Sequence, residues 1–464
     1  MTMSAAAVQR GGLHRSEHRL LLTTGDGVVA VVALAVALRI WSITTGFPFS
    51  FRFVVEHAAW LVAVPLWLGV TVPTRAWNSA HALPRTVGGL LSAAGALAAF
   101  YIVLYFYAPP SALARLPALY FLWEAVLLTI GWRLIYLFVL GRGAFTRRAV
   151  IVGDGPRAKA ARDLLQQEAR DTTVVGFVSD GEQPRTIDGE TIRPLSALDG
   201  LIDEGIAEVV LALEGTPSPI LSEQLLRLQE RGLEVVPFAA EYEQRLQRVP
   251  IDHVDSDWAF QSLPEWVRAR DASRLAKRVV DIVGSLVGII VFAVLALPVA
   301  AAILIDDGLP LFFRQQRIGR GGKRFDVLKF RTMRVGAEPD GARWASSDDP
   351  RTTRVGRWLR RARIDEWPQF LNVLRGDMSL VGPRPERPEF TEQLGRAIPF
   401  YRSRLMVQPG LTGWAQVNSD YGDSVEGQAR KLEYDLYYLK HRSLLFDAWI
   451  LLRTVGTVLG LGGH

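Results

Sequence analysis

Four long apolar stretches fill the first third of the chain, and no other feature constrains its fold as strongly. They cover residues 26–47, 53–72, 87–107 and 116–140. Each stretch has about the 20 residues that a helix needs to cross the hydrocarbon core of a bilayer. We therefore predict a membrane protein, with residues 1–25 as an N-terminal tail and residues 26–141 as a transmembrane domain of four helices.

The arginines predict how this domain is oriented. They concentrate before the first stretch, between the second and third, and after the fourth: Arg10, Arg15, Arg19, Arg75, Arg85, Arg142, Arg147 and Arg148. The other two loops carry only Arg52 and Arg115. Because basic residues accumulate on the cytoplasmic side, the N-terminal tail and everything after residue 140 should lie in the cytoplasm.

Composition limits the partners and the chemistry. Apolar residues make up 49% of the chain and the formal net charge is +6. In a membrane protein this charge indicates cytoplasmic Lys/Arg bias, so we expect a lipid bilayer and no nucleic acid as partner. The absence of cysteine excludes disulfides, thiol catalysis and cysteine-bound zinc. The seven histidines form no HExxH-like pair, whereas an oxygen-ligated Mg²⁺ stays open.

From residue 145 the pattern changes to short β-rich runs that alternate with helical runs. Strands are predicted at 148–153, 173–178, 208–212 and 233–237, and helices at 155–168 and 222–231. Such alternation is typical of parallel α/β folds, so we predict a Rossmann-like domain over residues 145–267.

This predicted domain opens with a GxGxxA turn at Gly153 and Gly155. Between a strand and a helix, such a turn can hold a dinucleotide pyrophosphate on the helix N-terminus. No acidic residue ends a clean second strand about 20 residues further on, and the nearest are Asp171 and Asp180. We therefore favour a structural or regulatory domain over one that binds NAD, with a nucleotide loop at Gly153 and Gly155 left open.

A fifth apolar stretch, residues 279–305, contains Pro298. Proline breaks the hydrogen-bond ladder of a helix, and the Lys/Arg-rich chain that follows argues against translocation. We predict a re-entrant helix that enters the membrane, bends at Pro298 and returns to the cytoplasmic face.

An adjacent acidic pair, Asp365 and Glu366, is the most informative feature of residues 270–464. Helical periodicity over residues 353–374 places the two about 100° apart, and Pro368 should kink the helix beside them. Arginines crowd the same turn, and they favour ionised carboxylates and can clamp phosphate oxygens. A carboxylate in this setting can attack phosphorus, although a solvated face with intrahelical ion pairs is the common alternative.

Several motifs in residues 273–464 together resemble the monotopic phosphoglycosyl transferases. They are KRVVD (277–281), the proline-broken apolar helix, KFRTM (329–333), the pair at 365–366, GDMS (376–379), PRP (383–385), PGLTGWAQ (409–416) and YDLYY (434–438). The preceding helices and α/β domain are similar to the large form of this family, described as undecaprenyl-phosphate hexose phosphotransferases. Residues 343–349 and 386–390 resemble its exopolysaccharide branch.

The resemblance implies an α-rich catalytic domain at residues 270–464, with a re-entrant helix at 279–305, on a bacterial inner membrane. Asp365 would take a hexose phosphate from a UDP-sugar, release UMP and pass the sugar phosphate to undecaprenyl phosphate. Glu366 would assist, either by positioning the metal or by deprotonating the incoming undecaprenyl phosphate, and the metal held at Asp365 and Glu366 would be Mg²⁺ or Mn²⁺. The resemblance implies that Lys329, Arg331, Arg360 and Arg384 bind phosphates and that Gln315, Arg317 and Asp435 serve the site, with a structural role for Asp435 as the alternative. It leaves a homodimer open.

Three departures from the family's pattern concern loops. Gln408 replaces a usual Arg or Lys, Asp420 stands where an Asn-Gly-Arg sequence often ends, and Leu297 replaces the serine before Pro298. The first two put in doubt any transfer of nucleotide contacts to that loop.

Two other functions remain as alternatives. A membrane-bound NAD-dependent sugar-nucleotide dehydratase or epimerase would need a Tyr-x-x-x-Lys pair, but the tyrosine of the α/β domain, Tyr242, is followed by Leu246. A non-catalytic scaffold in polysaccharide assembly is the second alternative, and the intact pair at 365–366 argues against it.

Overall fold

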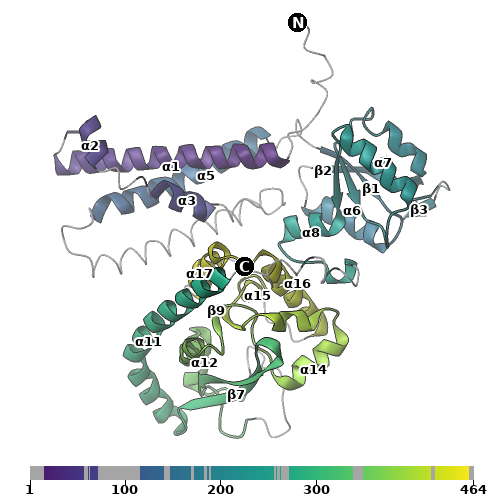
Figure 1. Cartoon of the computed structure of the whole chain (residues 1–464). Coiled ribbons are helices and arrows are strands. Elements are labelled where there is room, and N and C mark those ends of the chain that lie inside the picture. The colour runs from purple at the N-terminus through teal and green to yellow at the C-terminus, as the bar shows by residue number, and fades with distance from the viewer. Residues whose placement is uncertain are drawn as a thin grey trace. The chain divides into compact units, whose positions relative to one another are not determined.

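The computed structural model describes most of the chain and divides it into two compact units (Figure 1). The described residues are 15–46, 48–56, 61, 63–71, 115–140, 147–168, 172–181, 185–187, 190–254, 258, 262, 271–337, 349–419 and 424–458. The chain up to Leu246 belongs to the first unit, and Gln247–Gly460 form the second.

Helices from the apolar N-terminal region pack through small side chains. They are α1 (Arg15–Thr45), α2 (Phe51–Glu56), α3 (Ala63–Thr71) and α5 (Arg115–Leu140). Ala30, Ala33 and Ala37 are fully buried at helical spacing, so α1 and α5 can approach closely. A buried ion pair joins Arg133 of α5 to Asp26 of α1 at 2.7 Å.

The structure bears on three of the four predicted N-terminal helices. The first begins at Arg15 rather than at residue 26, because Asp26 faces Arg133 inside the helix packing instead of ending a polar tail. The second corresponds to α2 and α3, the fourth to α5, and the third, at 87–107, lies outside the described residues. Among the described residues, three helical segments are long and apolar enough to cross a membrane: Leu20–Thr44, Leu119–Tyr136 and Arg274–Asp307.

The α/β region contains a six-stranded sheet in the order β3-β4-β2-β1-β5-β6. The strands are β1 (Arg147–Val152), β2 (Thr172–Val178), β3 (Arg185–Ile187), β4 (Glu190–Arg193), β5 (Glu208–Leu211) and β6 (Glu234–Pro237). Neighbouring strands are parallel except β3 and β4. The predicted parallel α/β fold is confirmed.

Alternate residues of β1 enter separate cores on the two faces of this sheet. Val150 and Val152 pack with leucines of η4 (Leu195–Gly200) and α7 (Pro219–Glu230). Ile151 packs with α6 (Pro156–Glu168) and with Phe238 of α8 (Phe238–Leu246). The period-two side-chain alternation of a strand thus fills both layers.

From Gln247 on, the chain packs with the second unit, whereas the sequence places the end of the α/β domain near residue 267. The main-chain oxygen of Gln247 accepts a hydrogen bond from Trp414 Nε1 at 2.9 Å. The main-chain N–H of Val249 donates to the oxygen of Glu433 at 3.1 Å. These contacts hold the start of the second unit on its own α15 and α16.

The second unit is built around one long helix and two short strand pairs. Its elements are η5 (Ile251–His253), α11 (Asp271–Asp307), β7 (Phe312–Ile318), η6 (Arg320–Gly322), β8 (Arg324–Phe330), α12 (Arg354–Arg361), η7 (Ile364–Gln369), α13 (Phe370–Arg375), β9 (Ser379–Val381), α14 (Pro388–Ala397), η8 (Tyr401–Met406), β10 (Gly410–Thr412), α15 (Trp414–Asn418), α16 (Val425–His441) and α17 (Leu444–Val458). β7 and β8 form an antiparallel hairpin, and β9 pairs with β10 in parallel.

Helix α11 is apolar and largely exposed, and it bends along its length in Figure 1. Pro298 lies inside the helix, where the missing N–H and the ring favour such a bend. Leu297 beside it is 79% exposed.

The first half of α11 also holds the elements that lead to the site. Asp281 Oδ1 accepts hydrogen bonds from Ser379 Oγ and from the main-chain N–H of Leu380, both at 3.0 Å. Gly288 lets the helix meet Phe370 closely, because a Cβ there would lie 2.6 Å from the phenyl ring. β9 and α13, which flank residues 376–378 of the GDMS motif, are therefore fixed to α11.

Candidate active site

The acidic pair lies in a short 3-10 helix rather than in one long kinked helix. The predicted helix over 353–374 is interrupted at Arg363, which adopts a left-handed conformation with φ 57° and ends the α12 turn. η7 then carries Asp365 and Glu366, and α13 follows after Pro368. A non-glycine residue with positive φ is strained, and such strain is often found beside functional groups.

Glu366 is held by two cations from different elements. Arg384 clamps it with both terminal nitrogens, Nη2 at 2.5 Å from Oε1 and Nη1 at 3.2 Å from Oε2. Lys329 of β8 donates its Nζ to Oε1 at 3.2 Å. Although burial alone would raise the pKa of Glu366, these two cations hold it well below its usual value. Glu366 is therefore ionised at neutral pH and anchors Lys329 and Arg384.

Asp365 has a different environment one residue away. It is 7% exposed, and among the described residues no hydrogen bond to its carboxylate is found. Burial and the neighbouring charge of Glu366 raise the pKa of Asp365, while Lys329, Arg360 and Arg384 lower it less. An ionised carboxylate without hydrogen bonds keeps its lone pairs for a substrate or a metal.

Two predicted phosphate-binding arginines have other partners. Arg331 is 5% exposed and donates to Asp307 Oδ2 and to the main-chain oxygens of Asp307, Gly308 and Pro310. Its guanidinium thus fixes the end of α11. Arg360 donates to the hydroxyls of Thr332 and Thr352, at 2.9 and 3.3 Å, and acts on Asp365 through its charge.

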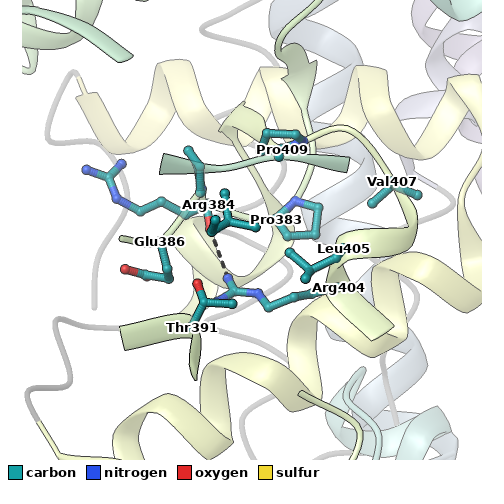
Figure 2. Close-up of a pocket in the computed structure, with 11 residues that line it drawn as sticks. Pro383, Arg384, Glu386, Thr391, Arg404, Leu405, Val407 and Pro409 are labelled. Atoms are coloured by element: carbon teal, nitrogen blue, oxygen red, sulfur yellow. Dashed lines mark hydrogen bonds between the residues drawn. The ribbon is translucent and has the colours of Figure 1, made fainter. Parts of the chain in front are cut away.

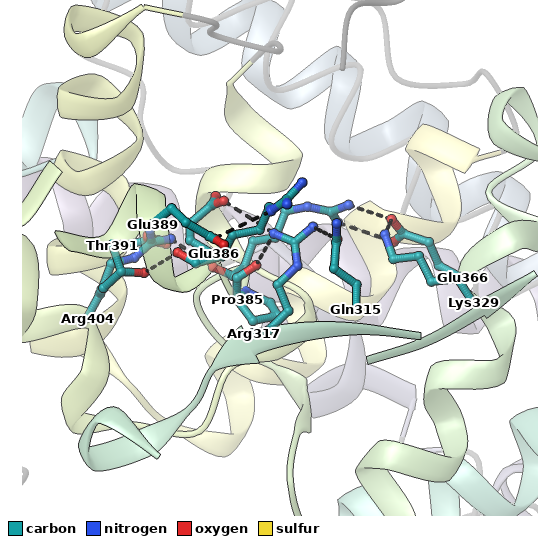
Figure 3. Close-up of polar contacts among 12 residues, drawn as sticks. Gln315, Arg317, Lys329, Glu366, Pro385, Glu386, Glu389, Thr391 and Arg404 are labelled. Carbon is teal, nitrogen blue, oxygen red and sulfur yellow. Dashed lines mark hydrogen bonds and ion pairs between the residues drawn. The ribbon is translucent and has the colours of Figure 1, made fainter. Parts of the chain in front are cut away.

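Two further predicted residues, Gln315 and Arg317, lie in the same group of polar contacts as Lys329 and Glu366 (Figure 3). Arg317 of β7 donates to Gln315 Oε1 at 2.6 Å and to the main-chain oxygen of Pro385 at 3.1 Å. Asp435 of α16 is 1% exposed and accepts from Arg404 at 2.9 Å. The structure therefore brings Gln315, Arg317, Lys329, Glu366 and Arg384 together, and Arg404 links Asp435 to the main chain of Arg384.

Sequence reasoning missed Arg404, which lines a small pocket with Pro383, Arg384 and Glu386 (Figure 2). It stands within residues 401–406, before the PGLTG motif and outside the motifs that carry the family resemblance. Gln408, one of the noted departures, donates to the main-chain oxygen of Gly376 at 2.7 Å and so joins two motif loops. Asp420 lies outside the described residues.

The glycine turn of the other unit is occupied by the chain itself. A Cβ on Gly155 would lie 2.7 Å from the Glu214 side chain, and Glu214 Oε1 accepts the main-chain N–H of Arg157 at 2.8 Å. Gly153 has φ 147°, and a Cβ there would lie 2.3 Å from the main-chain oxygen of Ala212. Asp180 accepts from the N–H and hydroxyl of Ser218. The position where a pyrophosphate would bind thus holds a carboxylate, which disfavours a dinucleotide.

The residues offer a metal only a small set of donors. Within the described part of the chain there is no group of three or more His, Asp or Glu that could hold a metal ion. Mg²⁺ commonly binds proteins through one or two carboxylates and completes its shell with substrate phosphates and water. The Asp365 carboxylate, with Glu366 beside it, fits that mode.

The acidic pair is buried among basic side chains, on a 3-10 helix that contacts α11, an apolar helix of membrane length. A sequence profile of the bacterial sugar transferases matches residues 272–460. The chain is 42% identical to the UDP-glucose:undecaprenyl-phosphate glucose-1-phosphate transferase of Caulobacter vibrioides, over 46% of this chain and 81% of the relative. It is 30% identical to a UDP-galactose-lipid carrier transferase of Erwinia amylovora, over 68% of this chain and 69% of the relative.

A third relative is a UDP-N-acetylgalactosamine-undecaprenyl-phosphate N-acetylgalactosaminephosphotransferase of Aeromonas hydrophila. It is 42% identical over 47% of this chain, and the match spans half of the relative's length. The chain belongs to the bacterial sugar transferase family, as its motifs predict.

Proposed function

We propose that this protein transfers a hexose 1-phosphate from a UDP-sugar to undecaprenyl phosphate at the cytoplasmic face of a bacterial inner membrane. The observation that carries the proposal is the contrast between adjacent carboxylates: Asp365 accepts no hydrogen bond from the described residues, while Glu366 is clamped by Arg384 and Lys329. The relatives' activities on undecaprenyl phosphate supply the substrates.

The reaction proceeds in two displacements at one phosphorus. A carboxylate oxygen of Asp365 attacks the sugar-bearing phosphorus of the UDP-sugar. The bond from this phosphorus to the bridging oxygen of the diphosphate breaks, and that oxygen leaves as part of UMP. A phosphate oxygen of undecaprenyl phosphate then attacks the same phosphorus and breaks its bond to Asp365. The products are UMP and undecaprenyl-diphosphate-sugar, and the carboxylate is restored.

The basic residues beside Asp365 and Glu366 give the two carboxylates different roles. Lys329 and Arg384 lie beside Asp365, where they can stabilise the charge that develops on the transferred phosphoryl oxygens. Mg²⁺ or Mn²⁺, held by the carboxylates and the diphosphate, would supply charge neutralisation when bound.

The membrane arrangement follows from the apolar helices. Asp281 and Gly288 attach the motif elements to α11, so an α11 inserted in the bilayer holds the site at the membrane surface. We propose that α11 is re-entrant at Pro298 and that the N-terminal region supplies four spans, three of which involve described helices. A label at Phe313 accessible only from the cytoplasmic side is the expected result, and access from outside would contradict it.

UMP release from a panel of UDP-sugars, with Mg²⁺ and undecaprenyl phosphate, tests the reaction and identifies the sugar. Glucose, galactose and their N-acetylated forms are the first donors to compare. We expect release from one donor by the wild type and none by Asp365→Asn. A folded protein in lipid that releases UMP from no UDP-sugar would contradict the proposal.

The rival dehydratase or epimerase function finds no support in the α/β domain. Tyr242 packs edge-on against Phe238 at 5.9 Å within a hydrophobic core, and Glu214 fills the turn at Gly155. An NAD-dependent dehydratase or epimerase would need Tyr242 and the turn at Gly155 to line an open substrate cleft.

A further inference from the structure

The loop that carries Arg384 is held by its main-chain oxygens. Residues 383–385 are Pro-Arg-Pro, so the segment has a single main-chain N–H, that of Arg384. Its three carbonyls accept hydrogen bonds from three different elements. Gly410 N–H donates to Pro383 at 2.8 Å, Arg404 Nη2 to Arg384 at 3.0 Å, and Arg317 Nη1 to Pro385 at 3.1 Å.

Arg404 is the most constrained of these donors. It is 7% exposed, and its Nη2 donates both to the main-chain oxygen of Arg384 and to Asp435 Oδ2, at 3.0 and 2.9 Å. Its Nη1 donates to the Tyr401 hydroxyl at 2.6 Å, and its guanidinium carbon lies 5.0 Å from that ring's centre. Figure 2 shows Arg404 reaching from η8 to the loop.

We propose that Arg404 is a positioning residue: anchored by Asp435 and Tyr401, it fixes the main chain of Arg384 so that the Arg384 guanidinium reaches Glu366. This assigns Asp435 to the anchor of Arg404 rather than to contact with substrate. The catalytic meaning of the arrangement rests on the proposed function, whereas the structural coupling between Arg404 and the pair formed by Arg384 and Glu366 does not.

A planar guanidinium suits this role because it presents several donors in fixed directions. Its fork reaches a phenol, a carboxylate and a main-chain carbonyl at once. A lysine at this position keeps the charge beside Asp435 but has no fixed fork, so it should leave the Arg384 carbonyl without its donor. Arg404→Lys therefore separates positioning from charge.

The first test is the coupling between Arg384 and Glu366 in the full chain, measured without substrate. Unfolding midpoints of Arg384→Ala, Glu366→Gln and the double variant give this coupling, first with Arg404 and then with Arg404→Lys. We expect the coupling to fall by at least half in the Arg404→Lys background. An unchanged coupling would overturn the proposal, since a residue that only stabilises the fold lowers all midpoints equally.

The second test uses UMP release by the same variants. Arg404→Lys should lower kcat about tenfold or more in the wild-type background, because small displacements of a charged group are costly to catalysis, and should add little to the loss in Arg384→Ala. The matched control is Arg248→Lys. Arg248 also forms an ion pair with α16, to Glu433 at 3.3 Å, and its replacement should leave kcat unchanged.

Equal factors of loss from Arg404→Lys in both backgrounds would overturn the positioning role. An inactive wild type would contradict the proposed function instead, and the coupling measurement would still decide the role of Arg404.

Discussion

The two units each contain a place where a phosphate would be expected, and they differ in what fills it. At Gly155 the chain's own Glu214 accepts the N–H at the start of α6. Beside Asp365, the ionised carboxylate of Glu366 accepts hydrogen bonds from Lys329 and Arg384. Asp365 itself accepts no hydrogen bond from the described residues. A glycine motif supplies main-chain geometry, but the neighbouring charges decide whether an anion can bind.

Replacing the proposed nucleophile should produce the largest difference between the two regions. Asp365→Asn keeps the shape of the side chain and removes its nucleophilic oxygen, so we expect UMP release to fall by about 10⁴-fold or more. Glu214→Gln, which neutralises the carboxylate in the glycine turn, should leave the rate unchanged. Comparable losses from both variants would break the distinction between the two sites.

The partner carboxylate should matter for stability as well as rate. Glu366→Gln removes the carboxylate that both Lys329 and Arg384 contact, which should cost about 3 kcal/mol of unfolding free energy. The exposed pair of Arg193 and Glu204 in the α/β domain gives the matched control. Glu204→Gln should change stability by less than about 1 kcal/mol. Chemical unfolding in detergent measures both, and similar values would refute the anchoring role of Glu366.

The pH profile should report Asp365. Its pKa is raised, whereas that of Glu366 is lowered, so protonation of Asp365 comes first as pH falls. The single-turnover rate of UMP release should decline at a pH above the usual aspartate range. In Glu366→Gln the decline should shift to lower pH, because a like charge is gone. A rate that stays constant well into the acidic range would contradict this account.

The same raised pKa has a consequence for stability. A carboxyl group with a raised folded-state pKa stabilises the fold below its unfolded value of about 3.9, and this contribution is lost as pH rises through the folded value. Ionised Asp365 thus costs stability at neutral pH. Asp365→Asn should raise the unfolding free energy by about 1 kcal/mol there, and a thermal melt at neutral and acidic pH checks that the gain disappears in acid.

The smallest effect concerns the glycine turn. The full chain should show no saturable binding of NADH by fluorescence, because Glu214 occupies the start of α6. Glu214→Ala should cost about 1 kcal/mol of stability through the lost cap. Tight NADH binding to the wild type would show that Glu214 moves aside.

Sequence patterns predicted the elements with strong periodicity or length. β1, β2, β5, β6 and α5 lie within one residue of the expected bounds, since burial on both faces or membrane length fixes them. The short β3 and β4 were not predicted, and α11 begins at Asp271 rather than at residue 279. The break at Arg363 was not predictable, because arginine has no preference for the left-handed conformation it adopts. Tertiary packing imposes it.

The site was predictable in its membership but only partly in its roles. The motif residues Lys329, Glu366 and Arg384 meet, as the clustering of their charges suggests. Arg331 has the same local signature, yet the end of α11 takes its donors. Which arginine faces a carboxylate of its own chain and which faces a substrate depends on contacts between distant segments, and these leave no local pattern.

The most direct test of the central claim is the intact mass of the protein after incubation with its UDP-sugar and Mg²⁺, without undecaprenyl phosphate. A covalent intermediate on Asp365 predicts a mass increase of one sugar phosphate, with stoichiometric UMP release, and loss of the adduct when undecaprenyl phosphate is added. No adduct in the wild type under conditions of rapid turnover, or an adduct that persists in Asp365→Asn, would contradict the account.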